Sequence, residues 1–132
     1  MNWTENQLRD YYKSLKGSAA PAPVVTKRCA NKWEAAYAEE LENEKRAGLI
    51  RNWWFEGVKF RLADGCWFLP DFLVEQFSGK FELHEIKGYW KDDALVKAKV
   101  MAEVFPFPLL AIRKKRVSEG GGWKMIRRFE KR

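Results

Sequence analysis

FLPDFLVEQFSGKFELHEIKGYW, residues 68–90, is the stretch that decides the fold. Aromatic and branched apolar residues fill both of its halves, and the SGK between them at 78–80 indicates a turn. The second half alternates between apolar and polar residues, as a strand does when one face is buried. The stretch therefore predicts two neighbouring strands, Cys66–Phe77 and Phe81–Trp90.

The sequence on the amino-terminal side predicts a third strand and a helix. WWFEGVKFRL at 53–62 is rich in aromatic and branched residues, and Asp64-Gly65 is a two-residue turn signal that joins it to Cys66–Phe77. Three consecutive strands would then form a meander or a set of hairpins. Further upstream, Asn31 suits an N-cap and Gly48 a helix stop. The apolar stripe of this helix would contain Trp33, Tyr37 and Leu41.

The carboxyl-terminal side predicts a helix and two more strands. DDALVKAKVMAEVF at 92–105 has a helical pattern that begins with capping aspartates and ends before Pro106. Phe107–Lys115 is typical of a strand, and glycines 120–122 separate it from a last strand at 123–129. The order helix, three strands, helix, strand, strand predicts a mixed β-sheet flanked by helices, in the α/β (α+β) class.

Residues 1–25 are expected to be an arm outside the core. Thr4–Leu15 predicts a short helix, and the small residues and prolines of Gly17–Pro23 indicate a semi-extended linker. The core domain would then occupy residues 26–132, with a basic carboxyl-terminal end.

Composition predicts a folded protein rather than a disordered one, since 46% of the residues are hydrophobic and 15% aromatic. No apolar run is long enough to cross a bilayer, and the amino terminus is too polar for a secretory signal, so we expect a soluble, cytoplasmic protein. Cys29 and Cys66 have no metal-binding or disulfide spacing, and both are expected to be reduced.

The charge distribution points to a polyanionic partner. The formal net charge is +7, and residues 106–132 hold nine basic and only two acidic side chains. Nucleic acid is the leading partner, although solvated basic tails give the same pattern and a membrane surface would also attract them. The expected phosphate contacts are Arg113, Lys114, Lys115, Arg116, Lys124, Arg127 and Arg128.

Asp71, Glu85 and Lys87 form the set of residues most suggestive of chemistry. A short turn between the two strands can bring Asp71 next to Glu85, and strand alternation places Glu85 and Lys87 on the same face. Two carboxylates suit Mg²⁺, and the backbone carbonyl of Ile86 is a possible further ligand. A nearby lysine can orient the attacking water and stabilise charge on phosphorus. The set predicts a site for phosphodiester hydrolysis.

Pro70, Asp71, Glu85 and Lys87 resemble the signature of PD-(D/E)XK nucleases. From Asn31 to about Arg113 the chain is similar to small phage-encoded members of that superfamily, with a layout like that of endonuclease I-type Holliday junction resolvases. In this group the lysine strand runs into KGYW or KGLW, as at 87–90 here, and a helix with acidic and basic residues follows. The resemblance implies a restriction-endonuclease-like mixed sheet.

The resemblance also implies roles for residues on both helices. It matches Glu34 to a supporting acid, and it implies that a lysine such as Lys97 can approach the cleft. For Glu34 the alternative is a capping box with Asn31, three residues earlier. For Lys97 the alternative is a solvated helix face.

Other residues have plainer alternatives. Asp71 is also compatible with a surface position, and Glu85 and Lys87 with an exposed ion pair. Glu75 is expected at the surface. His84 should point to the face opposite the site and be structural. The aromatic residues are expected in the core rather than in a stacking platform, and the ones considered are Trp53, Trp54, Phe55 and Trp67.

Together these observations predict an Mg²⁺-dependent DNA endonuclease in which Mn²⁺ can substitute. The resemblance implies branched DNA such as a Holliday junction, a role in phage recombination in the bacterial host cell, and a homodimer, because two symmetric cuts need two sites. The alternatives are a non-catalytic nucleic-acid-binding protein and a restriction-like or end-processing nuclease. RNA stays open as a substrate.

Overall fold

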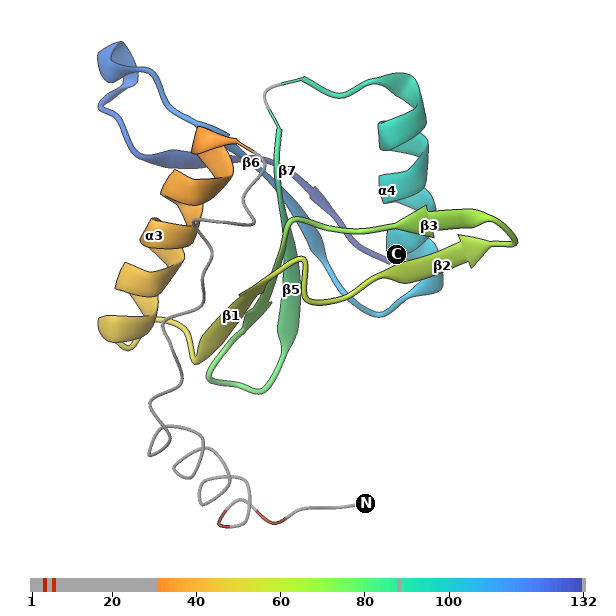
Figure 1. The fold of residues 1–132 in the computed structure, drawn as a ribbon, viewed down its shortest axis with the longest axis horizontal. Helices are drawn as coiled ribbons and strands as arrows, with labels where there is room; N and C mark the ends of the chain where they lie inside the picture. Colours follow the sequence, from red (N-terminus) through yellow and green to blue (C-terminus); the bar gives the residue numbers. More distant parts are fainter. Residues whose placement is uncertain (1–3, 5, 7–30, 88, 132) are drawn as a thin grey trace.

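The computed structural model describes residues 4, 6, 31–87 and 89–131. The expected arm helix, its linker and Cys29 lie outside these residues, apart from Thr4 and Asn6. Within this part of the chain the protein has two α-helices, a short 3₁₀ helix and two sheets, which confirms the predicted α/β (α+β) class (Figure 1). The elements are α3 Lys32–Arg46, β1 Asn52–Phe55, β2 Phe60–Ala63, β3 Cys66–Phe68, β4 Phe72–Glu75, β5 Phe81–Ile86, α4 Asp92–Val104, β6 Leu109–Lys114, η1 Val117–Glu119 and β7 Trp123–Phe129.

The main sheet has five strands in the order β1-β4-β5-β6-β7. Strands β5 and β6 run parallel because α4 connects them as a crossover, and the other neighbours are antiparallel. The predicted pairing of the two strands around the SGK turn is confirmed, with Phe72 opposite His84. The sheet is therefore mixed, as the element order predicts.

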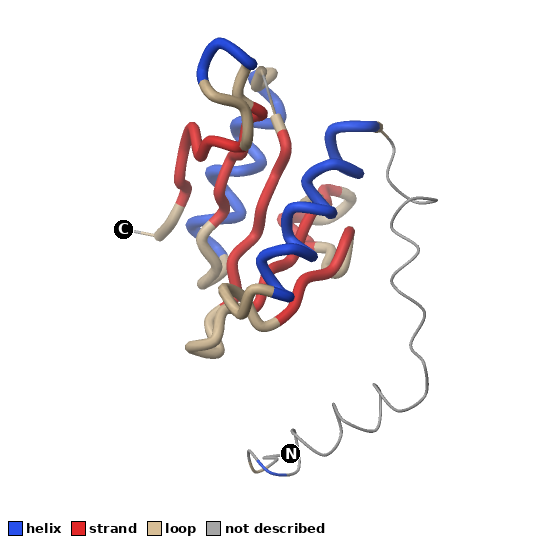
Figure 2. The backbone as a smooth tube through the Cα atoms, turned by 90° about the vertical axis from the view of Figure 1, so that its left-hand side faces the viewer, coloured by secondary structure: helices blue, strands red, loops and turns tan. Residues whose placement is uncertain are grey.

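The two helices cover opposite faces of this sheet, as Figures 1 and 2 show together. Strand alternation divides the core accordingly. On the side of α3 the buried residues include Tyr37, Leu41, Trp53, Phe72, Val74 and Leu110. On the side of α4 they include Leu83, Ala98, Met101, Leu109, Ala111 and Phe129. Neither helix is long and apolar enough to cross a membrane, and the same holds for the rest of the described chain.

Local sequence explains where both helices begin. The Asn31 side chain caps α3 by accepting hydrogen bonds from the backbone N–H groups of Trp33 and Glu34, each at 2.9 Å. The expected aspartate cap of α4 is wrong, because the N-cap is Lys91. Asp92 and Asp93 lie in the first turn instead, where their charge complements the helix dipole.

The expected strand at 53–62 is broken in the middle. Glu56 has a positive φ of 48°, which ends β1. At Gly57 a Cβ atom would lie 2.7 Å from the Cβ of Trp54, so only glycine fits this turn. The segment after this break forms β2, a strand of a different sheet.

The expected strand at 66–77 is also broken, because buried Pro70 has no N–H group to donate to a ladder. Strands β2 and β3 form a separate hairpin around the Asp64-Gly65 turn, which confirms the turn signal. Of the two expected arrangements the meander is wrong, since β1 pairs with β4 and this hairpin is inserted between them. The set of hairpins is confirmed at β2–β3 and β4–β5. In Figure 1 the hairpin extends beside α4, and Phe60 and Phe68 pack into the core on that side.

Candidate active site

Asp71 and Glu85 lie next to each other at one end of the β4–β5 pair. The register that places Phe72 opposite His84 places Asp71 opposite Glu85, one position further along. Phe72 and His84 face α3, so by alternation both carboxylates project from the other face. The Oδ2 atom of Asp71 accepts a hydrogen bond of 2.8 Å from the backbone N–H of Ile86. This bond fixes the carboxylate where the backbone ladder ends.

Glu85 is buried, with 5% of its surface exposed. Burial raises the pKa of this carboxyl well above its usual range, and the hydrogen bond to Asp71 and the charge of Asp71 raise it further. Lys87 and the backbone N–H of Asp71 act in the opposite direction. Two carboxylates in this arrangement hold either a shared proton or a cation between them. The donor set therefore fits a hard divalent cation such as Mg²⁺.

Lys87 follows β5 directly on the same side as Glu85. Its backbone N–H donates to the carbonyl of Ile112 at 3.0 Å, which continues the parallel pairing by one residue. Its Nζ atom lies 5.7 Å from the centroid of the Trp90 ring. Its positive charge acts to lower the pKa of Glu85, as expected for an ammonium group on the same side of the sheet. The structure thus brings together Asp71, Glu85 and Lys87.

Ile86 enters the site through its backbone N–H, whereas its side chain packs against the core beneath α3. The suggested role of its carbonyl as a metal ligand stays a prediction. Lys97 lies half-buried on α4, the helix that covers the face from which the carboxylates project. Its contact with a substrate also stays a prediction.

Glu34 lies in the first turn of α3, on the helix that covers the opposite face of the sheet from the carboxylate pair. In the described ranges, 31–87 and 89–131 with residues 4 and 6, no group of three or more His, Cys, Asp or Glu side chains is placed to hold a metal ion. The structure therefore assembles two carboxylates rather than three. The role of Glu34 as a supporting acid stays a prediction.

A basic groove adjoins the site at Lys87 and encloses about 410 Å³. Within it Arg113 donates to both carboxylate oxygens of Glu119, at 3.2 and 3.0 Å, and this contact lowers the pKa of Glu119 to about 2. Lys114 and Arg116 are exposed there. The groove is lined by Asn31, Trp33, Ile86, Lys87, Arg113, Lys114 and Arg116.

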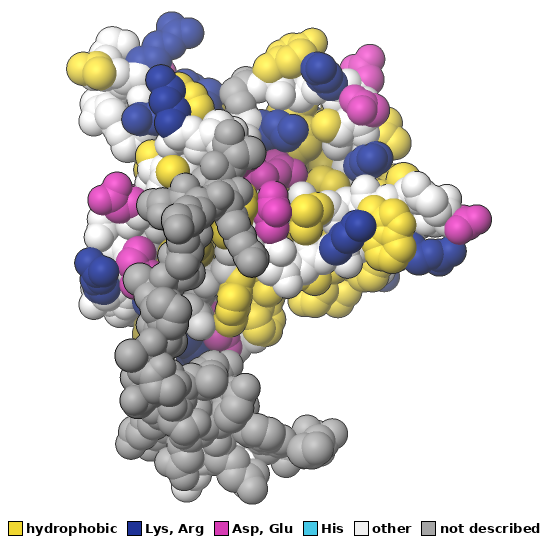
Figure 3. Space-filling view, viewed as in Figure 1, with side chains coloured by type: hydrophobic (Ala, Val, Ile, Leu, Met, Phe, Trp, Pro, Cys, Tyr) yellow, Lys and Arg dark blue, Asp and Glu magenta, His cyan; other side chains and the backbone are white. Residues whose placement is uncertain are grey.

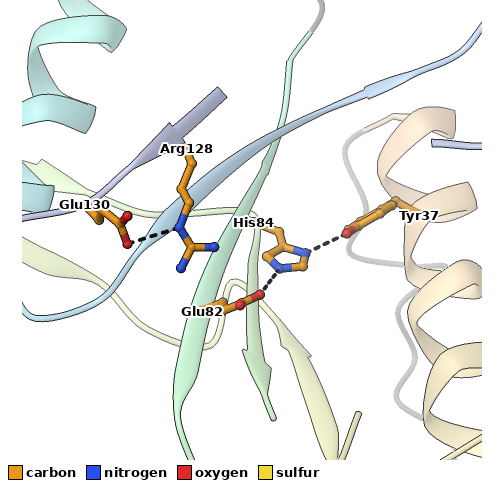
Figure 4. A network of polar contacts seen from close by, with 5 residues as sticks. All are labelled: Tyr37, Glu82, His84, Arg128 and Glu130. Atoms are coloured by element: carbon orange, nitrogen blue, oxygen red, sulfur yellow. Dashed lines mark hydrogen bonds and ion pairs between the residues drawn. The ribbon is translucent and has the colours of Figure 1, made fainter. Parts of the chain in front are cut away.

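The other expected phosphate contacts lie in more than one place, and Lys124 is the cross-strand neighbour of Arg113 in the groove. Arg128 pairs with Glu130 at 3.1 Å (Figure 4). It also lines a separate hollow beside the β4–β5 turn, at the opposite end of the strands. Arg127 lies with its guanidinium 4.6 Å from the ring centroid of Phe129. Lys124 is exposed on β7, opposite Arg113, and Lys115 is half-buried after β6. On the face shown in Figure 3, acidic side chains gather near the middle of the molecule with basic side chains above them.

His84 points away from the carboxylate pair, as predicted from alternation. Its Nδ1 atom is 2.6 Å from the hydroxyl of Tyr37, and its Nε2 atom is 3.1 Å from a carboxylate oxygen of Glu82 (Figure 4). The bond from His84 lowers the pKa of Glu82, and burial raises the pKa of Tyr37. This network ties α3 to the centre of the sheet, which is a structural role.

Three expectations about nearby side chains are wrong. Glu75 is buried rather than at the surface, because β4 is an inner strand and Arg51 is 3.9 Å from its carboxylate. Trp33 is 43% exposed, although helical spacing places it on the buried stripe with Tyr37. Trp67 is 44% exposed on β3 rather than in the core, whereas Trp53 is buried as expected.

Sequence reasoning missed Trp33 as a residue of the groove. The signal that was available is its position in the first turn of α3, two residues after the cap. A side chain so close to the helix end can project beyond the sheet that buries the rest of the stripe. An exposed residue at the helix end and the buried residues of the stripe follow the same periodicity. Spacing alone therefore does not distinguish an exposed Trp33 from a buried one.

Comparisons with known proteins return no family that matches this chain, and no match among curated proteins or solved structures. Function is therefore inferred from the geometry of the site and from the motif resemblance of the sequence.

Proposed function

We propose that this protein is a metal-dependent DNA endonuclease that hydrolyses phosphodiester bonds. The observation that supports it most directly is the contact between Asp71 and Glu85, with Lys87 on the same side. Glu85 is buried and Asp71 half-buried, and an acidic pair in such a position costs stability unless a proton or cation neutralises it, so such pairs are typical of functional sites. The basic groove beside Lys87 supplies a surface for phosphates.

In this proposal Asp71 and Glu85 hold Mg²⁺, which Mn²⁺ can replace. When bound, the cation supplies a water of lowered pKa and neutralises charge on the phosphate. Lys87 donates to the attacking water or to a phosphate oxygen and so orients the water for in-line attack. Asp71 stays oriented by its bond from the N–H of Ile86.

We propose branched DNA, such as a Holliday junction, as the substrate. The motif resemblance to phage endonuclease I-type resolvases supports this choice, together with a role in recombination in the cytoplasm of a bacterial host. The exposed basic residues lie on more than one element rather than along one recognition helix, which favours recognition of DNA shape. A resolvase acts as a homodimer, because it makes two symmetric cuts.

A binding protein without catalytic activity is the second candidate function. One observation favours it, namely that only two carboxylates come together among the residues that the structure describes. It differs from the nuclease in one measurable respect, since binding needs no divalent cation and cleavage does.

Cleavage of a labelled four-way junction tests the proposal, beside a linear duplex and a single strand, with Mg²⁺ or with EDTA. Lys87→Ala is compared with Lys80→Ala, a change at an exposed lysine in the β4–β5 turn at the other end of the strands. We expect paired Mg²⁺-dependent cuts in the junction that Lys87→Ala abolishes and Lys80→Ala leaves intact. Cuts in linear duplex at fixed sequences would indicate a restriction-like enzyme, and tight binding without any cut would indicate the second candidate.

A further inference from the structure

The groove beside Lys87, here called the Trp33 groove, combines an exposed aromatic side chain with basic ones, so it offers a surface for a base as well as for a phosphate. It lies where the amino terminus of α3 meets the ends of the parallel strands β5 and β6, and Lys87 belongs both to it and to the candidate active site. Lys87 therefore joins the groove to the candidate active site, while Trp33 lies at the start of α3, the helix that covers the other face of the sheet from Asp71 and Glu85.

One part of the groove is flat and apolar. Trp33 is 43% exposed there, and Ile86 contributes a second apolar surface. Exposed indole rings are the surfaces on which proteins stack unpaired bases, whatever the sequence of the strand. The groove volume of about 410 Å³ is near the lower end of the range for small-ligand sites, which suits one nucleotide better than a segment of duplex.

The other part of the groove is cationic. Arg113 is engaged by Glu119, whereas Lys114 and Arg116 are exposed. The Nζ atom of Lys114 lies 5.0 Å from the ring centroid of Trp33 and 6.0 Å from that of Trp123. A cation–π contact at an exposed site is weaker than the stacking of a base on tryptophan. A base can therefore replace the ammonium group on Trp33, while the flexible lysine stem keeps that group close enough to bind the attached phosphate.

We propose that the Trp33 groove binds one unpaired nucleotide of a DNA strand, with its base stacked on Trp33 and its phosphate held by Lys114 and Arg116. This inference rests on the proposed nuclease function and specifies its substrate class. DNA with unpaired nucleotides, as at forks, flaps and frayed junctions, is then preferred to continuous duplex, because a paired base is not available for stacking.

Binding in EDTA tests the groove separately from catalysis. The probe is a fluorescently labelled forked duplex, compared with versions that lack the base at the first, second or third unpaired position of either arm. Trp33→Ala, Trp33→Phe and wild-type protein are titrated by anisotropy. Trp67→Ala is the matched control. Like Trp33, Trp67 is exposed, at 44%, and has a lysine over its ring, with the ammonium group of Lys59 at 4.8 Å from the centroid. It lies on the β2–β3 hairpin and not in the Trp33 groove.

We expect Trp33→Ala to weaken binding to the intact fork about tenfold, which is within the range for loss of one stacked base, and Trp33→Phe to retain most of the affinity. On the fork that lacks the stacked base, wild type and Trp33→Ala should bind equally. Trp67→Ala should show no dependence on any missing base. Circular dichroism melting of each variant confirms that it is folded.

Equal binding of Trp33→Ala and wild type to the intact fork would overturn the inference. The same would follow if Trp33→Ala weakened binding equally whether or not the base is present. Mg²⁺-dependent cleavage that depends on Lys87 but not on Trp33 would support the nuclease proposal and contradict the role of the groove. Base-dependent binding through Trp33, without cleavage, would instead support the role of the groove and contradict the nuclease proposal.

Discussion

At Glu85 the charged form that would bind a cation also destabilises the folded protein. Its pKa is held above the ordinary value of 4.5, so the folded protein binds a proton that the unfolded chain releases more easily. Stability from this group is therefore lost as pH rises above 4.5 toward the raised folded pKa. Glutamine keeps the hydrogen-bonding capacity but does not ionise. We expect Glu85→Gln to melt at least about 4 °C higher than wild type at pH 8 in EDTA, with a smaller difference at pH 5.

Thermal melting at the two pH values checks this prediction, and Mg²⁺ provides a second readout. Excess Mg²⁺ should raise the melting temperature of wild type but not that of Glu85→Gln. Glu82→Gln is the control, because its effect should have the opposite pH dependence. The pKa of Glu82 is lowered, so its ionised carboxylate stabilises the fold above its ordinary pKa of 4.5, and this stabilisation is lost as pH falls. A Glu85→Gln difference that is the same at pH 5 and pH 8 would contradict the assignment.

Tyr37 and His84 make a prediction that separates stability from activity. Tyr37→Phe removes the hydroxyl that lies 2.6 Å from Nδ1 of His84 and leaves a buried polar atom without its partner. The cost should be about 1–3 kcal/mol in the free energy of unfolding, measured with urea. Tyr89→Phe, at a tyrosine that is 80% exposed, should cost nothing measurable. Mg²⁺-dependent cleavage by folded Tyr37→Phe at saturating DNA should be unchanged, since this network lies on the other face of the sheet from Asp71 and Glu85.

At the scale of secondary structure, the start of α3 has two roles that one substitution separates. Asn31 caps the helix and also lines the Trp33 groove. Asn31→Ala should lower the free energy of unfolding by about 1 kcal/mol. Asn31→Asp should preserve stability, because aspartate is an equally good cap, but weaken DNA binding by adding negative charge to the groove. Asn43→Ala, at an exposed helix position, is the control for both measurements, and a loss of stability in Asn31→Asp equal to that in Asn31→Ala would contradict the cap.

Patterns within a few consecutive residues predict most of the helices and strands. The main errors are strands that the sequence predicts as continuous and that the structure divides in two. The Asp64-Gly65 turn, both helices and the β4–β5 pair were predicted because each has its own signal in a few consecutive residues. The breaks at Gly57 and Pro70 were missed because aromatic residues continue across them. Asp71 and Glu85 were predicted to meet since strand alternation and a short turn determine their contact. The exposure of Trp33 was not predicted, because it depends on where the sheet ends.

At the scale of the whole molecule, the positive charge is divided between two ends. The Trp33 groove contains Lys114 and Arg116, whereas Arg128 is paired with Glu130 near the other end of the strands. We expect the double change Lys114→Ala with Arg116→Ala to weaken DNA binding and to reduce the slope of log K against log salt by about 2, because each lost phosphate contact removes about 0.9. Arg128→Ala should leave the slope nearly unchanged.

Titrations of a labelled fork at several KCl concentrations check this division. A slope that falls equally in Arg128→Ala and in the double variant would mean that DNA contacts both ends of the molecule. An unchanged slope in the double variant would remove the Trp33 groove from the interface.

The inserted β2–β3 hairpin has a consequence for how the chain folds. It lies between β1 and its partner β4, so this pairing must close a loop of more than a dozen residues. Strands β4 and β5 are joined by only a short turn, and pairings between distant residues form more slowly than local ones. Asp71 and Glu85 both belong to this local pair. The two acidic groups therefore meet early, and their mutual repulsion acts on the folding rate as well as on the finished protein, so neutralising Glu85 should accelerate folding more than it slows unfolding.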